Sequence, residues 1–278
     1  MMMPDAPKPS SPTAIVTGGA SGIGRAFAVA LARSGVLVFV ADRQLDGVER
    51  VVREIVGDGG QARAAVLDVR NGEQFSNLAA AVVRSAGRID YLFNNAGIGV
   101  LGQAAGFSDA DWSEVLDVNL RGVCHGIAAA YPQMIRQQRG HIVNIASLAG
   151  LVPAPLAASY TASKFGVVGL SRALRVEASR HGVRVSVVCP FIVDTPLLSG
   201  GGYSRINDDA RSVTAGRPLL QRLAVHPDRL ARGVLRQLAR NRAVIVYPPW
   251  ARLFWHADRL SPWISERVTR ALMNRFLR

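Results

Sequence analysis

Tyr160 and Lys164 have the residue types and the spacing that proton transfer requires. A separation of four residues places both side chains on one face of a helix. A phenol with its ordinary pKa of about 10 is a poor base at neutral pH, and a nearby ammonium group favours the phenolate and lowers that pKa. The pair therefore predicts a tyrosine that acts as acid and base. An unremarkable helix-surface pair is the alternative.

Two further observations favour the chemical interpretation. Lys164 is one of only two lysines in a chain that otherwise carries its positive charge on arginine. A compact ammonium group can reach contacts beside a phenol that a planar guanidinium does not fit. Ser147 follows the apolar run His141–Ile145, and its hydroxyl could hydrogen-bond a substrate oxygen next to the phenol. A turn serine at a strand end is the alternative for this residue.

A second constellation is the glycine-rich segment Thr17–Gly24, between an apolar run and a helical pattern. Gly18, Gly22 and Gly24 allow a tight turn and a close approach of the backbone to a pyrophosphate. The N-terminus of the following helix adds free N–H groups and the positive end of a helix dipole. The placement between strand and helix predicts a dinucleotide-binding loop rather than a plain turn.

Asp42 ends the second apolar run, eighteen residues after Gly24. A carboxylate at this position can accept hydrogen bonds from an adenosine ribose and would repel a 2′-phosphate, which favours NAD over NADP. Two alternatives stay open. Asp42 could cap the following helix, and the guanidinium of Arg43 could receive the phosphate of NADP.

Short apolar runs alternate with helical patterns through most of the chain. The expected strands are Ala14–Thr17, Val36–Ala41, Ala64–Leu67, Ile89–Phe93, His141–Ile145, Val183–Val188 and Val244–Tyr247. The expected helices are Ile23–Ser34, Leu45–Val56, Glu73–Ala86, Asp111–Gln137 and Ala158–Arg180. Continuously apolar strands between helices predict an α/β fold, a doubly wound parallel sheet of the Rossmann type with helices on both faces. Its ligand site is expected at the carboxyl ends of the strands.

Taken together, residues 13–197 resemble the short-chain dehydrogenase/reductase family. The matching segments occur in the order and at the spacings of that family. They are Thr17–Gly24, Asp42, Asp68 with Val69, Asn94–Gly97, Asn119, Ser147, Tyr160 with Lys164, and Pro190–Thr195. The resemblance implies a nicotinamide-dependent enzyme that acts on CH–OH or C=O groups.

The resemblance assigns catalytic roles to four residues. Tyr160 would be the general acid/base, and Ser147 would orient and polarise the substrate oxygen. Lys164 would bind the nicotinamide ribose and lower the pKa of the tyrosine. Asn119 would hold a water that relays protons from Lys164 to solvent.

The resemblance also implies a cofactor surface, in which Asp68 contacts the adenine and Thr195 the carboxamide. Its expected members are Gly18, Ser21, Gly22, Ile23, Gly24, Asp42, Arg43, Asp68, Val69, Asn95, Ala96, Gly97, Tyr160, Lys164, Pro190, Ile192 and Thr195. The family usually has glycine after the proline, where this chain has Phe191. We expect that side chain to narrow or reshape the pocket near the nicotinamide.

Residues 13–247 are expected to form one domain with a substrate lid at about 197–233, hinged at Gly200–Gly202. The expected pocket walls, 98–103, 148–156 and the lid, are mostly apolar and predict a hydrophobic secondary alcohol or ketone. An NADPH-dependent carbonyl or ketoacyl reductase is one alternative. A cofactor-binding regulator or membrane-associated scaffold on the same fold is an alternative of another class.

The formal net charge is +13, and the last quarter of the chain holds much of it. The segment 248–278 interleaves arginines with three of the four tryptophans, and Ile264, Val268, Ala271, Leu272 and Phe276 share one helical face. Basic amphipathic helices with tryptophan suit membrane interfaces. Packing on the core or on a neighbouring subunit is the alternative.

The remaining features predict ordinary properties. Residues 1–12 resemble a disordered leader without an apolar segment, so the cytoplasm is the expected location. Cys124 and Cys189 are expected to be buried thiols, and the five histidines lack the spacing of metal ligands, so no metal is expected. No nucleic-acid-binding motif is present. The resemblance implies a homodimer or homotetramer that pairs the two long helices.

Overall fold

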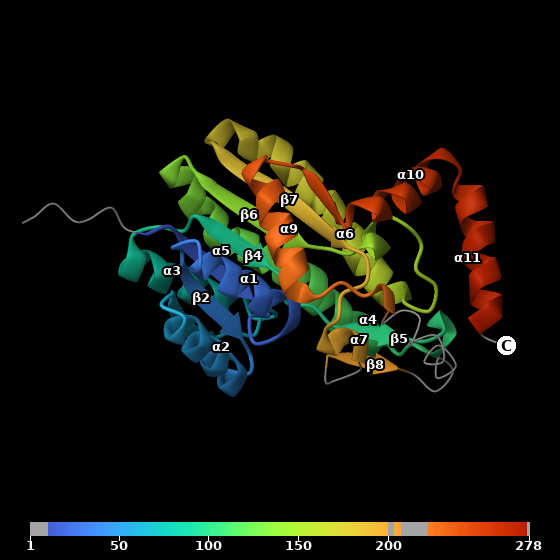
Figure 1. Ribbon diagram of the computed structural model, residues 1–278, viewed down its shortest axis with the longest axis horizontal. Helices are drawn as coiled ribbons and strands as arrows, with labels where there is room; N and C mark the ends of the chain where they lie inside the picture. Colours follow the sequence, from blue (N-terminus) through green and yellow to red (C-terminus); the bar gives the residue numbers. More distant parts are fainter. Residues whose placement is uncertain (1–10, 200–202, 207–221, 277–278) are drawn as a thin grey trace, which may run out of the picture.

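The computed structural model describes residues 11–199, 203–206 and 222–276. Within this part of the chain, seven parallel strands form a central sheet in the order β3-β2-β1-β4-β6-β7-β9 (Figure 1). The strands are β1 (Thr13–Thr17), β2 (Leu37–Asp42), β3 (Gln61–Val66), β4 (Tyr91–Asn94), β6 (Gly140–Ile145), β7 (Val183–Pro190) and β9 (Val244–Tyr247). The predicted doubly wound sheet is confirmed, and most of the predicted leader lies outside the described residues.

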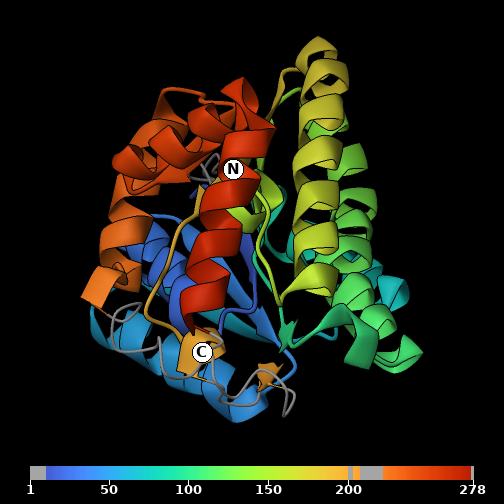
Figure 2. The ribbon, with the colours of Figure 1, turned by 90° about the vertical axis from the view of Figure 1, so that its right-hand side faces the viewer.

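Helices cover both faces of the sheet. One layer contains α1 (Gly22–Ala32), α2 (Leu45–Gly57) and α9 (Pro227–Ala239), and the other contains α3 (Gly72–Ala86), α5 (Gly122–Gln137) and α6 (Ala158–Ala178). Figure 2 shows α5 and α6 on one side of the sheet, with α1, α2 and α9 on the other. Apart from the largely exposed edge strand β3, the strands are buried on both faces, which explains why their runs are continuously apolar rather than alternating.

The long helix predicted for Asp111–Gln137 is divided into three parts. Ser108 caps α4 (Asp109–Leu116) through a reciprocal capping box with Asp111. A π-helical segment, η2 (Asp117–Arg121), then leads into α5. An insertion of this kind rotates the following residues and is frequent at functional sites. It contains Asn119, which is completely buried.

A second, two-stranded sheet was not predicted. β5 (Gly99–Leu101) pairs in parallel with β8 (Ser204–Ile206), which follows the short helix α7 (Pro196–Ser199). Within the predicted lid, residues 200–202 and 207–221 lie outside the described residues. The lid prediction is wrong for its last seven residues, because they begin α9, where Leu230 and Ala231 are completely buried in the core beneath α1.

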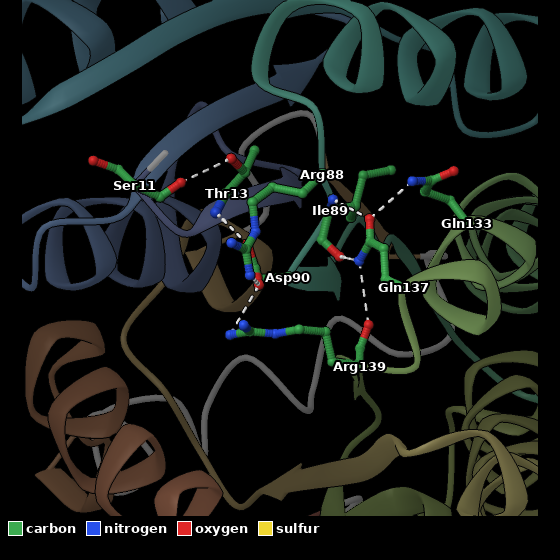
Figure 3. Close-up of polar contacts among 8 residues, drawn as sticks. All are labelled: Ser11, Thr13, Arg88, Ile89, Asp90, Gln133, Gln137 and Arg139. Carbon is green, nitrogen blue, oxygen red and sulfur yellow. Dashed lines mark hydrogen bonds and ion pairs between the residues drawn. The ribbon is translucent and has the colours of Figure 1, made fainter. Parts of the chain in front are cut away.

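The amino end of the sheet carries a closed network of polar side chains, shown in Figure 3. The carboxylate of Asp90 accepts hydrogen bonds from Arg88 Nε (2.7 Å) and from the Thr13 amide (2.9 Å), and it pairs with Arg139 (3.4 Å). Beside it, the side-chain amide of Gln137 bonds both the N–H and the carbonyl of Ile89. This amino-end network ties β1, β4 and the loop before β6 together.

The chain ends in two helices, α10 (Arg252–Leu260) and α11 (Pro262–Phe276), which we call the C-terminal arm. Pro262 disfavours helical geometry at Ser261, and the helix breaks there. Among the described residues, no helix combines the length and the apolarity that crossing a bilayer requires. Cys189 is buried as expected. Cys124 is exposed, so that prediction is wrong: its position on α5 faces outward.

Candidate active site

A cleft of about 990 Å³, partly open to solvent, lies at the carboxyl ends of the strands. Most of the residues that sequence analysis placed in the site line this cleft. They are Gly18, Ser21, Gly22, Ile23, Asp42, Arg43, Asp68, Val69, Asn95, Ala96, Gly97, Tyr160, Lys164 and Thr195. The others, Gly24, Asn119, Ser147, Pro190 and Ile192, are not part of the lining. The fold thus gathers residues from six separate segments at one edge of the sheet.

The glycine-rich loop lies close to the end of β4, the strand beside β1 in the sheet. Gly18 has a positive φ of 64°, and a Cβ atom there would come within 2.8 Å of the Ala96 backbone. A Cβ atom on Gly24 would overlap the carbonyl oxygen of Gly18. Because Gly24 has no side chain, the first turn of α1 can pack against the Gly18 backbone. The N-terminus of α1 then faces the cleft. This cradle fits a pyrophosphate.

Asn95 fixes the shape of that loop. Its side-chain amide donates hydrogen bonds to the carbonyl oxygens of Thr17 (2.9 Å) and Gly18 (3.3 Å). The Thr17 hydroxyl in turn accepts from the amides of Asn95 (3.0 Å) and Ala96 (3.1 Å). Asn95 and Ala96 were predicted to lie along a cofactor. The structure shows that they also lock the glycine-rich loop to the end of β4.

Asp42 is buried at the end of β2 and faces the glycine-rich loop. Its carboxylate accepts hydrogen bonds from the amides of Ala20 (3.3 Å) and Gln44 (3.1 Å). The capping alternative is not supported, because the N-cap of α2 is Gln44. Arg43 lines the same cleft, so a carboxylate and a guanidinium are both present where an adenosine ribose would lie.

Arg70 is a lining residue that sequence analysis missed. Its guanidinium binds the Asp68 carboxylate through Nε (3.0 Å) and Nη2 (2.5 Å). This hydrogen bonding holds the pKa of Asp68 below its ordinary value. The carboxylate is therefore ionised and fixed at the end of β3. The Asp-Val-Arg sequence at 68–70 is the signal that could have indicated the pair.

Tyr160 and Lys164 lie in the first part of α6, and Lys164 is almost completely buried. The ammonium nitrogen donates a hydrogen bond to the carbonyl oxygen of Ile145 (2.9 Å) and lies 5.4 Å from the centre of the Tyr160 ring. Burial lowers the pKa of Lys164 to about 8. The strand end of β6 thus positions the lysine next to the phenol ring inside the cleft.

The expectation that Lys164 lowers the pKa of Tyr160 is wrong for this structure. Burial raises the pKa of the phenol above its ordinary value, and hydrogen bonding to the Ser147 side chain opposes that rise. Lys164 is not among the groups that shift the pKa of the phenol, and its ammonium group donates a hydrogen bond to the carbonyl oxygen of Ile145. The desolvation of the phenol outweighs the hydrogen bonding to Ser147.

Ser147 lies two residues after the end of β6 and is a turn residue, while its predicted hydrogen bond to a substrate oxygen stays a prediction. Its hydroxyl accepts a hydrogen bond from the Ala149 amide (3.1 Å) and so caps the 3-10 turn η3 (Leu148–Gly150). The same side chain hydrogen-bonds the Tyr160 phenol. The turn therefore holds the hydroxyl in place beside the phenol.

Asn119 holds the pocket wall in position. Its side-chain oxygen accepts from the Ile98 amide (2.9 Å), and its side-chain nitrogen donates to the Ile98 carbonyl (2.9 Å) and to the Ser163 hydroxyl (3.1 Å). The π-helical segment is thereby tied both to the strand end after β4 and to α6. Its predicted part in a proton relay stays a prediction.

Phe191 does not enter the pocket, so the expectation that it narrows the nicotinamide site is wrong. Its ring lies 5.2 Å from that of Trp250 and stacks on Phe254 at 5.9 Å between ring centres. The side chain thus contacts the start of the C-terminal arm. Aromatic partners more than fifty residues away offered it more apolar contact than the cleft did.

Three further lining residues come from the segment after β7. Pro196, Leu197 and Tyr203 face the cleft, and the Tyr203 carbonyl accepts a hydrogen bond from the Gly99 amide (3.0 Å). The parallel pairing of β5 with β8 brings this segment to the pocket. Leu197 and Tyr203 fall within the segment 197–233 that was expected to wall the pocket. The pairing itself was missed, because strands of three residues carry no periodic signal.

Comparison with known proteins is consistent with this geometry. A family model for short chain dehydrogenases matches residues 12–201. The chain is 33% identical over 221 residues to the 3-oxoacyl-[acyl-carrier-protein] reductase FabG of Thermotoga maritima, covering 80% of this chain and 87% of the relative.

Two solved structures of short-chain enzymes add the cofactors. A short chain dehydrogenase/reductase from Burkholderia phymatum in complex with NAD is 32% identical, with a TM-score of 0.81, covering 90% of this chain and 94% of that one. A metagenomic short-chain oxidoreductase in complex with NADP is 40% identical, with a TM-score of 0.63, covering 65% of this chain and 82% of that one.

Proposed function

The chain belongs to the short-chain dehydrogenase/reductase family, and on that premise we propose that it is an NAD(H)-dependent enzyme that interconverts a hydrophobic secondary alcohol and its ketone. Membership makes it an oxidoreductase that acts on CH–OH or C=O groups with a nicotinamide cofactor. The pairing of Tyr160 with the buried Lys164 in the cleft gives the proposal its strongest support.

The residues of the cleft fit a nicotinamide dinucleotide. The glycine-rich loop and the N-terminus of α1 would hold the pyrophosphate, and Asp42 would bind the adenosine ribose. Asp68 with Val69 would lie at the adenine, and Thr195 at the carboxamide. The cofactor supplies or accepts the hydride. The buried Asp42 carboxylate favours NAD, because it would repel a 2′-phosphate that Arg43 alone would attract.

The proton chemistry follows from the state of Tyr160. With its pKa raised by burial, the phenol is protonated at neutral pH and can donate its proton to a carbonyl oxygen that is being reduced. In the reverse direction the phenolate takes the proton of the alcohol hydroxyl. Ser147, held beside the phenol, would orient the substrate oxygen. Lys164 adds a positive charge beside the ring. The protonated fraction of this lysine falls as the pH rises through its pKa of about 8.

The walls of the cleft near Tyr160 support an apolar substrate. Ile98, Pro196, Leu197 and Tyr203 line the cleft together with Tyr160. These side chains favour a substrate with an apolar surface that they can cover. A charged substrate would need an ion-pairing side chain in the cleft wall. A 3-oxoacyl thioester, the kind of substrate that the FabG relative is named for, is the alternative.

Turnover assays with both cofactors and two substrate panels test the proposal. We expect oxidation of cyclic and long-chain secondary alcohols with NAD, and slower turnover with NADP. Preferential reduction of 3-oxoacyl thioesters with NADPH would replace the proposal with the ketoacyl-reductase alternative. Cofactor binding without turnover of any alcohol, ketone or thioester would favour a regulator on the same fold.

We also propose that the protein assembles into a homodimer or homotetramer through its long helices. Phe165 and Val176 are exposed apolar side chains on α6, and Gly169 between them has open space beside it. A flat apolar helix face of this kind suits pairing with a second copy. Substituting Phe165 and Val176 with serine is expected to reduce the molecular mass measured by light scattering to that of a monomer.

A further inference from the structure

The C-terminal arm presents its apolar side chains outward. On α11, Trp263, Ile264 and Val268 are 63%, 54% and 55% exposed, whereas Ser265 and Thr269, which lie further round the helix, are partly covered. A helix that packs on a protein core does the opposite, because burial of apolar surface is the main gain. The outward arrangement therefore makes these side chains available to a binding partner.

The arm continues this surface through α10. Leu253 and Leu260 on that helix are 70% and 87% exposed. Figure 1 shows both helices reaching past the carboxyl ends of the strands, with α11 at the outer margin of the molecule. The arm is anchored at its base, where Phe191, Trp250 and Phe254 contact one another and Ala251 is buried. An arm with an anchored base and an exposed apolar surface is suited to bind a partner through that surface.

The charges of the arm indicate the kind of partner that it binds. The sequence 252–278 holds six arginines and two acidic residues. Arg267 lies over the ring of Trp263 at 4.5 Å, and Arg259 lies 5.8 Å from the ring of Trp255. Tryptophan beside a cation, among exposed aliphatic side chains, is the composition of helices that lie in the headgroup region of a bilayer.

A second copy of the chain fits this surface less well. Two arms in contact would bring their like charges together, because each carries six arginines and two acidic residues. Repulsion of that kind disfavours contact between two arms. An anionic lipid surface offers negative charge to the arginines and acyl chains to Trp263, Ile264 and Val268. Each arginine near such a surface adds to the affinity.

From these observations we propose that the C-terminal arm binds the surface of membranes that contain anionic lipids, with α11 lying in the plane of the headgroups. The proposal goes beyond the proposed enzymatic function and does not depend on it. It places the mouth of the cleft, at the same end of the sheet as the arm, close to the lipid.

Flotation of the full-length chain with vesicles tests the proposal. We expect flotation with vesicles of phosphatidylcholine and phosphatidylglycerol, and none with phosphatidylcholine alone. A double variant Arg267→Glu with Arg270→Glu, and a triple variant Trp263→Ser, Ile264→Ser and Val268→Ser, should each bind at least about tenfold more weakly. Raised salt should weaken binding of the unaltered chain.

A matched control separates the arm from net charge. Arg53→Glu with Arg84→Glu changes the net charge by the same amount on α2 and α3, far from the arm in Figure 1. This control should keep its flotation. The proposal is overturned if the unaltered chain does not float, or if the arm variants float as it does. It is also overturned if they instead convert a larger oligomer to a smaller one without any vesicle binding.

Discussion

Both ends of the central sheet bury polar side chains, but they satisfy them in different ways. In the amino-end network, the Asp90 carboxylate is surrounded by an arginine, a second ion-pair partner and a backbone amide. At the carboxyl end, Tyr160 and Lys164 face a cleft, and burial shifts their pKa values in opposite directions. Polar groups that close on one another stabilise the fold. Groups that face a cleft with shifted pKa values are placed to act on a ligand.

Removing the phenol hydroxyl should give the largest effect and should affect function alone. Tyr160→Phe deletes the group that donates or accepts the substrate proton, and we expect the turnover number to fall by about 1000-fold. The free energy of unfolding should change by no more than about 1 kcal/mol, because the ring and its contacts remain. Steady-state kinetics and denaturant unfolding measure the two quantities.

Cofactor affinity provides the control for this variant. Titration of NADH by fluorescence should give the same dissociation constant for Tyr160→Phe as for the unaltered chain. Turnover within about threefold of the unaltered enzyme would contradict the assignment of Tyr160 as the acid and base.

Breaking the amino-end network should have the converse effect. Asp90→Ala leaves Arg88 and the Thr13 amide without their partner in a buried place, and we expect about 3 kcal/mol loss in the free energy of unfolding. Turnover per folded molecule should not change, since Asp90 lies at the far end of the strands from the cleft. Thermal or urea denaturation monitored by circular dichroism gives the stability.

Arg139→Gln is the matched control at this end. Its side chain is 63% exposed and its ion pair with Asp90 is the longer one, so the expected loss is below about 1 kcal/mol. Equal losses for the two variants would show that burial of the carboxylate does not set the stability of the network.

The two ends also differed in how far the sequence could predict them. At the carboxyl end, glycines, Asp42, Tyr160 and Lys164 occur in short local motifs, and a parallel sheet necessarily collects strand ends at one edge. At the amino end, Asp90, Gln137 and Arg139 come from segments with no pattern of their own. Their contacts depend on side-chain packing across three elements, which no spacing along the chain reveals.

Phe191 and Tyr203 show the same limit inside the site itself. The neighbours of Phe191 are aromatic residues about sixty positions later, so its departure from the cleft could not be read locally. Tyr203 enters the cleft because a three-residue strand pairs with another. The sign of the Tyr160 pKa shift was also missed. It depends on burial and on hydrogen bonding to Ser147, and both are tertiary properties.

His141 extends the amino-end comparison to pH. It is buried in β6, where its Nε2 contacts the Ser186 hydroxyl (2.9 Å), and burial lowers its pKa to about 4 from the ordinary value of 6.5. The unfolded chain therefore binds a proton more readily between these values. The free energy of unfolding should therefore fall as the pH drops below about 6.5, and the fall should level off near pH 4. The total loss should be about 3 kcal/mol.

His141→Gln isolates this contribution, because a glutamine amide can still donate to Ser186 but does not titrate. Between pH 6.5 and pH 4, the free energy of unfolding should fall less in the variant than in the unaltered chain. The difference between the two losses should be about 3 kcal/mol. Parallel curves would mean that His141 is not the group responsible. No cofactor should be needed for the effect, since it arises at the end of the sheet opposite the cleft.

Asp42 belongs to the carboxyl end, yet like Asp90 it is a buried carboxylate with backbone donors. Those donors are two neutral amides, and no arginine closes around it as Arg88 closes around Asp90. We therefore expect its charge to remain available to a ribose. Asp42→Ser should shift the ratio of catalytic efficiencies with NAD and NADP by about 30-fold toward NADP, measured with one alcohol. Arg43→Ala should leave NAD use unchanged and weaken NADP use. An unchanged ratio in Asp42→Ser would mean that the carboxylate only supports the loop, as Asp90 supports the sheet.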